Sequence, residues 1–392
     1  MVFAAAVAAP LLGELTRRFG LSVVVLELLL GVAIGPQGLG WAAPSGGVPY
    51  FALLGMAFLF FVAGLEIDLE AIGGKPLSLA MIGWLIVFAL ALAVAVGMRG
   101  AGLVEAWVVV GIALATTALG VLVPILRDSA ALETPFGRHV LALGALGELG
   151  PILAMSLALS RQHTVTGQTA FTFLFIAIVL AVAWALVQGR NVPRVLGVLR
   201  RTMTQSSQLP IRTIMLIVGA LALLADLLGL DVALGALAAG MIIALATRGL
   251  DRHLLHHKID AIGFGFLVPV FFITSGMKLE VSAIFGSAAG LALTGLFFVG
   301  LLAVRLPLYA LYRRMLGGRE SAALTLYSAT TLSLVVALTQ VAVDNGLMQA
   351  AEAAPLVGGA MLSVILFPII ALGLTGQSVA AVTVHARDRD GL

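Results

Sequence analysis

One acidic residue lies near the centre of an otherwise apolar segment. Glu148 stands in HVLALGALGELGPILAMSLAL, within a helix that we predict over residues 138–159. An ionisable side chain at the centre of a membrane helix costs about 2.5–3.5 kcal/mol or more. Small residues near Glu148 let another helix backbone approach closely, and a proline frees a backbone carbonyl group one turn back. These neighbours are Gly144, Gly147, Gly150 and Pro151. The pattern favours a carboxylate that binds a small cation or, in its place, a proton. A structural hydrogen bond to a neighbouring helix is the alternative.

A hydroxyl-rich phrase occurs twice in the chain. ALATTALG spans residues 113–120 and YSATTLSL spans residues 327–334, and both interrupt apolar segments. We predict that each marks a broken helix, where freed backbone groups and hydroxyls line a cavity. Thr116 and Thr117 are then candidate ligands of a cation or proton beside Glu148. We expect the two breaks to cross at Ala115, Thr330, Thr331 and Ser333. The alternative is that the hydroxyls bond back to their own helices.

One basic residue also lies deep within an apolar segment. Arg305 stands in FFVGLLAVRLPLYALY, and Pro307, two residues later, is expected to kink the helix. A guanidinium at that depth must face protein or water and find an acceptor. Glu148 is one candidate acceptor, and the negative C-terminal ends of the broken half-helices are another. Snorkelling of the side chain to an interface is the alternative.

The composition places these residues in a membrane protein. Of 392 residues, 61% are hydrophobic and 10% are charged, and the mean hydropathy is +1.13. We therefore predict an all-α polytopic membrane protein. Apolar runs predict thirteen helices, at residues 2–16, 22–36, 50–65, 77–98, 104–126, 138–159, 170–188, 210–228, 231–247, 260–277, 284–312, 320–343 and 354–375.

The basic residues predict the orientation of these helices. With thirteen spans, every Lys and Arg falls on one side of the membrane except four. Arg99, Arg161 and Lys278 fall on the other side, and Arg305 lies within a helix. Because cytoplasmic loops hold the excess of Lys and Arg, the N-terminus is predicted outside and the C-terminus in the cytoplasm. The cell membrane of a bacterium, its inner membrane, is the expected location.

Several functions are disfavoured by what the sequence contains. The pI near 9.6 reflects basic residues in short gaps between apolar runs, which indicates topology and not nucleic-acid binding. The chain has no cysteine, so no disulfide, thiol nucleophile or thiolate metal site is expected. No P-loop or zinc motif occurs, so ATP-driven transport is not expected, and no cofactor is predicted.

The two hydroxyl-rich phrases are related by their positions in the helix order. They fall in predicted helices 5 and 12, which are seven spans apart and therefore run in opposite directions. This arrangement is typical of an inverted repeat, with helices 1–6 and 8–13 as the two halves and helix 7 as the connector. Inverted-repeat transporters place their sites where such broken helices meet near the midplane of the bilayer.

Other polar residues have simpler interpretations. Glu27 lies within an apolar segment, and it could serve either packing or a dimer interface. Asp226 and Asp231 flank a short turn and are expected to be solvated caps.

Four segments together resemble a known family. The order of these segments resembles that in monovalent cation:proton antiporters of the Kef-like and NapA-like branch. The segments are, in order, GVAIGPQGLG, FLFFVAGLEIDLEAI, ALATTALGVLVPILRD and VPVFFITSGMKLE. The resemblance extends along nearly the whole chain. It implies an inverted-repeat Na+/H+ antiporter fold of thirteen helices with two crossed broken helices, and a homodimer in the lipid bilayer.

The resemblance also implies a division into two bundles. Helices 1–3 and 8–10 would form a dimerising scaffold, and helices 4–6 and 11–13 would form a moving transport domain. The corresponding ranges are 1–67 and 210–277 for the scaffold, 77–159 and 284–375 for the transport domain, 170–188 for the connector and 376–392 for a short cytoplasmic tail. The tail is too short for the nucleotide-binding domain of Kef-type systems. A separate regulatory subunit is left open.

The chain departs from the family pattern at its central acid. Relatives usually carry an aspartate there, often preceded by Asp, Asn or Gln, whereas this chain reads Gly147-Glu148. Arg305 resembles the basic residue of a later helix in relatives. The expected mechanism uses one carboxylate, Glu148, which binds Na+ or K+ and then a proton in alternation. Since arginine stays protonated, one titrating group indicates electroneutral one-for-one exchange.

Two other functions are kept as alternatives. The first is a sodium-coupled organic-anion symporter of similar fold, which would have a larger polar cavity. The second is an intramembrane lipid-modifying enzyme that uses Glu66 and Asp68. No second cluster of acids, histidines or metal ligands faces that pair in the sequence, so the enzyme is the weaker alternative.

Overall fold

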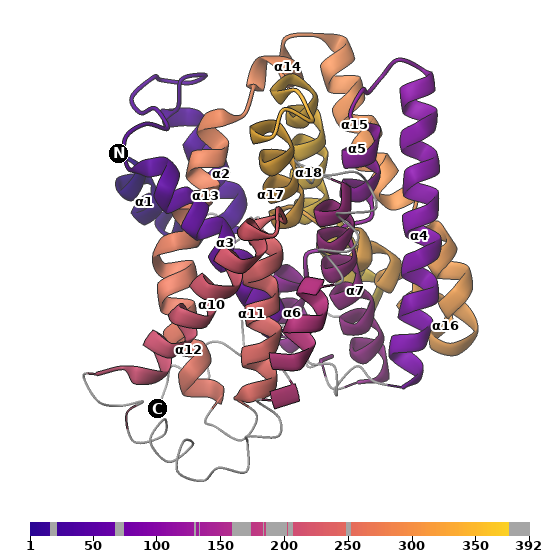
Figure 1. The fold of residues 1–392 in the computed structure, drawn as a ribbon. Helices are drawn as coiled ribbons and strands as arrows, with labels where there is room; N and C mark the ends of the chain where they lie inside the picture. The colour runs from indigo at the N-terminus through magenta and orange to yellow at the C-terminus, as the bar shows by residue number, and fades with distance from the viewer. Residues whose placement is uncertain are drawn as a thin grey trace.

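The structure is a computed structural model in which the described residues form helices and no strands (Figure 1). The described residues are 1–15, 22–66, 74–128, 131–132, 134–158, 174–182, 184–185, 202, 207–247 and 252–375. The first half contains α1 (Val2–Leu15), α2 (Val23–Ile34), α3 (Val48–Glu66), α4 (Lys75–Gly100), α5 (Trp107–Leu114), α6 (Leu119–Asp128) and α7 (Pro135–Ala158).

The second half begins after a region that is only partly described. It contains α10 (Leu209–Leu227), α11 (Val232–Ala246), α12 (Arg252–Ile262), the π-helix η2 (Gly263–Leu267), α13 (Val268–Lys278), α14 (Val281–Phe285), α15 (Ala288–Ala303), α16 (Leu306–Ala329), α17 (Ser333–Asp344) and α18 (Ala350–Thr375). Within the predicted connector 170–188, the structure describes residues 174–182 and 184–185, which are helical.

The helices have the length and composition of membrane spans. Seven helical stretches among the described residues are long and apolar enough to cross a membrane, and three shorter apolar helices accompany them. The prediction of an all-α polytopic protein with thirteen helices is confirmed. The structure carries more labels than thirteen partly because a broken or kinked helix has several labels: α5 and α6 are one such set, and α12, η2 and α13 are another.

One predicted helix is interrupted in its interior. The stretch 284–312 was expected to be one kinked helix, but α15 ends at Ala303 and α16 begins at Leu306. Pro307 lies in the first turn of α16, where its missing N–H costs nothing. A second corner follows at Gly317, whose φ of 80° and ψ of 171° are not helical. Glycine tolerates this positive φ because it has no β-carbon.

The described helices pack into two groups (Figure 1). We call α1, α2, α3, α10, α11, α12, η2 and α13 the first bundle. We call α4 to α7 and α14 to α18 the second bundle. Contacts between the bundles run mainly through α3, α11 and α13 on one side and α6, α7 and α17 on the other. The two bundles therefore meet along a seam between these helices.

Glycines allow the helices of the first bundle to approach closely. A β-carbon on Gly31 of α2 would lie 2.8 Å from the carbonyl carbon of Ile273 in α13. Reciprocally, a β-carbon on Gly276 of α13 would lie 3.0 Å from the carbonyl carbon of Leu28. Small residues are the usual means of close helix packing in membranes, where lipid removes most of the hydrophobic drive for association. These glycines therefore let α2 and α13 pack backbone against backbone.

Gly31→Ala is expected to destabilise the protein by about 1–3 kcal/mol, because its β-carbon would overlap the Ile273 backbone. The matched control is Gly219→Ala in α10, where no atom lies within 4 Å of the new β-carbon. Alanine there should leave stability unchanged or raise it slightly. Unfolding in mixed detergent micelles measures both. Equal stability of the two variants would contradict the close approach.

Candidate functional site

Two broken helices cross inside the second bundle. The first break separates α5 from α6, and the second separates α16 from α17. The N–H of Ala118 donates to the carbonyl of Thr330 over 2.9 Å, and the hydroxyls of Thr116 and Thr331 are 2.8 Å apart. Both threonines are fully buried. The two hydroxyl-rich phrases therefore lie against each other.

Hydroxyl groups bind the backbone carbonyls that the breaks leave without helical partners. Thr117 Oγ1 donates to the carbonyl of Ser328 over 2.7 Å. Thr116 Oγ1 lies 2.7 Å from the carbonyl of Ala113 and also faces Thr331. The bond from Thr116 to the carbonyl three residues earlier is local and competes with helix formation, which fits the end of α5 at this point. The bond from Thr117 instead joins the two breaks.

A serine of the last helix supports the second break. Ser363 in α18 is fully buried, and its hydroxyl lies 2.9 Å from the carbonyl oxygen of Thr331. The N–H of Thr331 also donates to Ser363 Oγ over 3.1 Å. The sequence reasoning missed this residue. Its only signal was one hydroxyl in the apolar stretch GAMLSVILF.

The guanidinium of Arg305 holds both breaks together. Its Nε donates to the carbonyl of Ser328 over 2.6 Å, and its Nη1 donates to the carbonyl of Leu114 over 2.6 Å. Nη1 also donates to the carbonyl of Leu301, and Nη2 donates to the carbonyl of Thr116. The side chain is 1% exposed, so it does not snorkel.

These contacts decide between the two predicted acceptors of Arg305. Leu114 is the last residue of α5, and Ser328 lies one residue before the end of α16. The guanidinium therefore faces the C-terminal ends of two half-helices, where backbone carbonyls carry partial negative charge. Among the described residues no ion pair joins Arg305 to Glu148. Of the two predicted acceptors, Arg305 therefore binds the C-terminal ends of the half-helices and not Glu148.

Glu148 faces the start of the other half-helix. The backbone N–H of Leu119, the first residue of α6, hydrogen-bonds its carboxylate. The side chain is 8% exposed, and its Oε2 has no hydrogen-bond partner in the described part of the protein. A buried carboxylate oxygen without a partner is costly, so it needs a ligand. Glu148 has the features expected of a cation or proton site.

The residue before Glu148 has to be small. The N–H of Thr117 donates to the carbonyl of Gly147 over 2.9 Å, which ties α7 to the crossing. A β-carbon on Gly147 would lie 2.7 Å from the Cβ of Thr117. The close approach therefore excludes a second acid at this position in the arrangement seen here.

A cavity of about 380 Å³ connects Glu148 to the seam between the bundles. We call it the Glu148 cavity. Its polar lining includes Glu66 of α3, Glu148 of α7 and Ser333, the first residue of α17. Thr116 and Thr117 do not line it, although both lie at the adjacent crossing. Their predicted role as ligands stays a prediction, while Ser333 and Glu148 face the same space.

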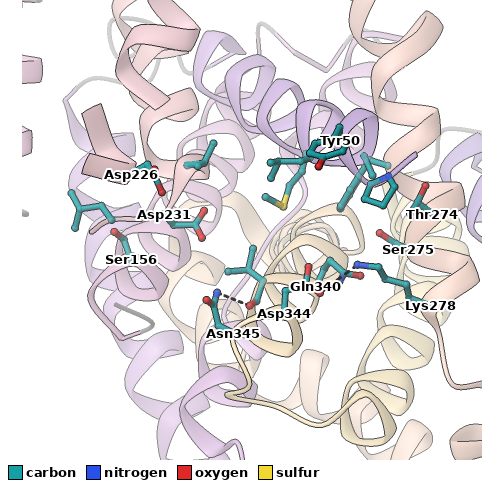
Figure 2. A pocket seen from close by; sticks show the side chains of 18 of the residues that line it. Tyr50, Ser156, Asp226, Asp231, Thr274, Ser275, Lys278, Gln340, Asp344 and Asn345 are labelled. Carbon is teal, nitrogen blue, oxygen red and sulfur yellow. Dashed lines mark hydrogen bonds and ion pairs between the residues drawn. The ribbon is translucent and has the colours of Figure 1, made fainter. Parts of the chain in front are cut away.

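A second cavity, of about 570 Å³, opens at the other end of the seam (Figure 2). We call it the Asp344 cavity. Tyr50, near the start of α3, lines the Asp344 cavity. Glu66, at the end of the same helix, lines the Glu148 cavity. Lys278 of α13 and Asp344 of α17 form an ion pair of 3.3 Å across the two bundles. Asp226 and Asp231 also line this cavity, and Asp231 caps α11 by accepting from the N–H of Ala233.

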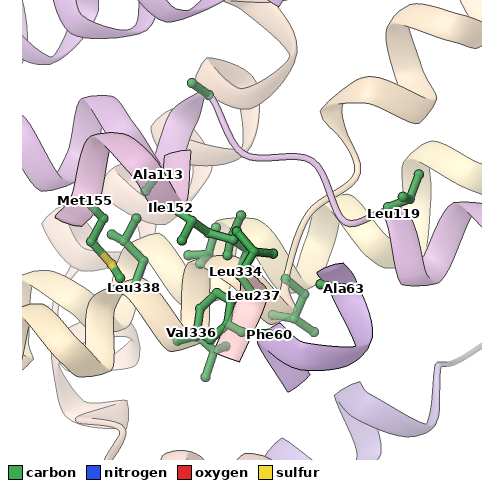
Figure 3. Close-up of a cluster of buried hydrophobic side chains, with 14 of the residues drawn as sticks. Phe60, Ala63, Ala113, Leu119, Ile152, Met155, Leu237, Leu334, Val336 and Leu338 are labelled. Carbon is green, nitrogen blue, oxygen red and sulfur yellow. The ribbon is translucent and has the colours of Figure 1, made fainter. Parts of the chain in front are cut away.

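Buried apolar side chains lie between the residues of α3, α7 and α17 that line the two cavities, and Figure 3 shows part of this cluster. They come from both bundles and include Phe60, Leu237, Ile152, Met155, Leu334 and Leu338. Along α7, Glu148 lines one cavity and Ser156 lines the other, with Ile152 and Met155 between them. Eight residues of helix span about 12 Å. The site is therefore open toward one end of the seam and sealed from the other by apolar packing.

Glu27 does not join this site. The side chain is 4% exposed within α2 and lines neither of the two cavities. Its role in packing or in a dimer interface stays open. Asp68, the second acid of the enzyme alternative, lies outside the described residues.

Comparisons with known proteins agree with this geometry. The family model described as "Sodium/hydrogen exchanger, transmembrane" matches residues 3–375. The chain is 26% identical over 382 residues to a Na(+)/H(+) antiporter of Enterococcus hirae, covering 91% of this chain and 92% of that protein. It is 27% identical over 286 residues to the Na(+)/H(+)-K(+) antiporter GerN of Bacillus cereus, covering 70% of each.

A solved structure shows the same fold. The sodium proton antiporter MjNhaP1 from Methanocaldococcus jannaschii superimposes with a TM-score of 0.68, although only 14% of its residues are identical. The match covers 97% of each chain. The arrangement of the helices is therefore shared along nearly the whole length.

Arg305→Ala is expected to lower the free energy of unfolding by about 3 kcal/mol or more, since each hydrogen bond to a charged group contributes about 1.5–3 kcal/mol. Arg305→Lys should recover only part of this, because an ammonium cannot reproduce the planar fork. Arg314→Ala, at an exposed position of α16, is the matched control. Denaturation in mixed micelles measures all three. Wild-type stability of Arg305→Ala would contradict the capping of the half-helices.

Gly147→Ala is expected to separate α7 from Thr117 and to reduce both stability and cation-dependent activity. Overpacking of this kind costs about 1–3 kcal/mol. Gly295→Ala in α15, where the new β-carbon meets no atom within 4 Å, is the control. A Gly147→Ala variant with unchanged melting behaviour would show that the contact with Thr117 can relax.

Proposed function

The chain belongs to the transmembrane sodium/hydrogen exchanger family, and from this membership we propose that it exchanges a monovalent cation, Na+ or K+, for protons across a membrane. One observation supports Glu148 as the site of this exchange. Glu148 is a buried carboxylate with one unpartnered oxygen, and it lines a cavity that reaches the seam between two bundles. Oxygen ligands suit a hard monovalent cation, and the same oxygens can hold a proton.

The exchange follows from competition for one carboxylate. A cation enters the Glu148 cavity and binds Glu148, with Ser333 and freed backbone carbonyls as further oxygen ligands. The second bundle then moves against the first, and the site opens toward the Asp344 cavity. A proton displaces the cation there, and the protonated site returns. Since an empty, charged Glu148 would have to cross the apolar residues that separate the cavities, only loaded states cross at an appreciable rate.

We propose the following moving and fixed parts, and the packing of the helices supports this division. Residues 77–159 and 284–375 form the transport domain, residues 1–67 and 210–277 form the scaffold and dimer contact, and residues 170–188 connect them. The glycine-mediated packing of the first bundle supports its role as the fixed part. The seam between the bundles contains both cavities, which supports movement along it.

The charge carried in each cycle is set by Glu148 and Arg305. Arg305 binds four backbone carbonyls and does not line the Glu148 cavity, so its charge travels unchanged in both directions. Glu148 carries either one cation or one proton. Electroneutral one-for-one exchange follows.

The alternative of an organic-anion symporter is disfavoured by the charge of the site. The Glu148 cavity contains the carboxylates of Glu66 and Glu148, and no basic side chain occurs among its described lining residues. Such a cavity attracts cations and repels anions. The enzyme alternative is set aside, since the family consists of transporters.

The surroundings of the protein follow from the same assignment. The chain is an integral membrane protein, and we propose a homodimer in the inner membrane of a bacterium. By the distribution of Lys and Arg, the N-terminus lies outside and the C-terminus lies in the cytoplasm. The Glu148 cavity, at the C-terminal end of α3, then faces the cytoplasm. The exchange requires no cofactor.

Glu148→Gln is expected to abolish exchange, because the amide can neither release a proton nor neutralise a cation. Proteoliposomes with an internal pH dye measure this when Na+, K+, Li+ or choline is added outside. Glu27→Gln is the control, since Glu27 is buried but lines neither cavity, and it should retain exchange. Wild-type rates in Glu148→Gln would remove this carboxylate from the mechanism.

A further inference from the structure

Three helices of the second bundle bring exposed basic side chains together at one end. Lys75 begins α4, Arg138 lies in the first turn of α7, and the corner of α16 carries three arginines. These are Arg313, Arg314 and Arg319, and all five side chains are exposed. We call the five residues the basic patch. We infer that the basic patch, with the apolar helix faces beside it, binds an anionic phospholipid.

A ring contact joins the start of α7 to the corner of α16. The rings of His139 and Tyr312 lie edge to face, with their centroids 5.7 Å apart. His139 follows Arg138 directly in α7, and Tyr312 directly precedes Arg313 in α16. The two arginines are therefore neighbours of residues that touch, and they lie at the same end of the bundle.

The helix α4 lies beside the same part of α16 (Figure 1). A β-carbon on Gly83 of α4 would lie 3.3 Å from Leu311 Cδ2 of α16. Lys75 stands eight residues before Gly83, which is about 12 Å of helix. The opposite end of α4 carries Arg99, whose guanidinium lies 6.0 Å from the ring centroid of Trp107 at the start of α5. Lys75 therefore belongs to the end of α4 that faces away from the start of α5.

The helix faces beside the patch are suited to acyl chains. Ile82 and Leu85 of α4 and Leu306 of α16 are each at least half exposed. Apolar side chains of a membrane helix that no protein covers lie against lipid. Tyr309 of α16 is partly exposed, and the guanidinium of Arg313 lies 6.0 Å from its ring centroid. Because tyrosine is enriched at the level of the lipid headgroups, the basic patch stands where a headgroup would lie.

The charges of the basic patch are not used within the described part of the protein. None of its five side chains forms an ion pair with a described residue. Glu320, next to Arg319, is the only acid on α4 or α16. The positive-inside rule explains why basic residues lie at one end of a membrane protein. Their position on three adjoining helices, beside an apolar face, in addition offers several N–H donors to one phosphate group.

The affinity for an anionic lipid tests the inference. The purified, delipidated protein is titrated in detergent with phosphatidylglycerol and, separately, with phosphatidylcholine, and bound lipid is counted by native mass spectrometry. The native protein should prefer phosphatidylglycerol. Arg314→Gln/Arg319→Gln should bind it about tenfold more weakly, because each basic residue near an anionic lipid adds to the attraction. Arg314→Lys/Arg319→Lys keeps both charges and should retain most of the affinity.

The matched control is Arg99→Gln/Arg212→Gln, which also removes two positive charges from exposed positions. Arg99 lies at the opposite end of α4, and Arg212 lies on α10 of the first bundle. The control should change the affinity for phosphatidylglycerol less than twofold. An equal loss in the two glutamine variants would overturn the inference, as would a native protein that binds both lipids equally.

Two further outcomes are decisive. Displacement of the bound lipid by glycerol phosphate at the same concentration would show that a free phosphate is the ligand, and it would overturn the lipid site. If Arg314→Gln/Arg319→Gln does not fold, Arg138→Gln is titrated in its place, and an unchanged affinity there overturns the inference. Because lipid binding is measured without transport, its failure leaves the proposed exchange untouched.

Discussion

The fold depends on how the backbone carbonyls at two helix breaks find hydrogen-bond donors. Two helices break inside a bundle from which water is excluded, and each break leaves backbone carbonyls that must find donors. The guanidinium of Arg305 donates to carbonyls at the C-terminal ends of both half-helices, and buried hydroxyls bind others. A guanidinium suits this place because its five N–H groups point in fixed directions and stay charged. Without it the crossing would hold several unsatisfied groups, and the helices would have no reason to stay broken.

The same crossing of broken helices also determines the chemistry where the second half-helices begin. The half-helices α6 and α17 begin at the Glu148 cavity, with Leu119 binding Glu148 and Ser333 lining the space. Arg305 thus supplies positive charge on one side of the crossing, and Glu148 supplies negative charge on the other side. The apolar side chains between the residues that line the two cavities, part of which Figure 3 shows, then allow Glu148 to be reached from one end of the seam only. A carboxylate that can be reached from one end at a time is what coupled exchange requires.

Much of this could be predicted from the sequence, and the rest depended on tertiary contacts. The repeated phrase predicted two breaks in antiparallel helices, and Arg305 and Glu148 were conspicuous because charges are rare in apolar segments. Periodicity could not show that Arg305 binds the carbonyls of Leu114 and Ser328 and not Glu148, since all three lie far from it in the chain. The same limit hid Ser363, whose partner is 32 residues away, and the break before Pro307. Glu66 was weighed only as part of an enzyme, because nothing in the sequence brings the end of α3 to the start of α6.

The central claim is that one carboxylate carries all the exchanging charge while Arg305 remains fixed in the crossing. The most direct measurement is the initial rate of proton flux in proteoliposomes at a fixed pH gradient, over a series of imposed membrane potentials. If Glu148 alternates between one cation and one proton, the rate and its direction do not depend on the potential. A rate that rises steadily with the potential at constant pH gradient would mean that net charge crosses in each cycle, and a second titrating group would then have to exist.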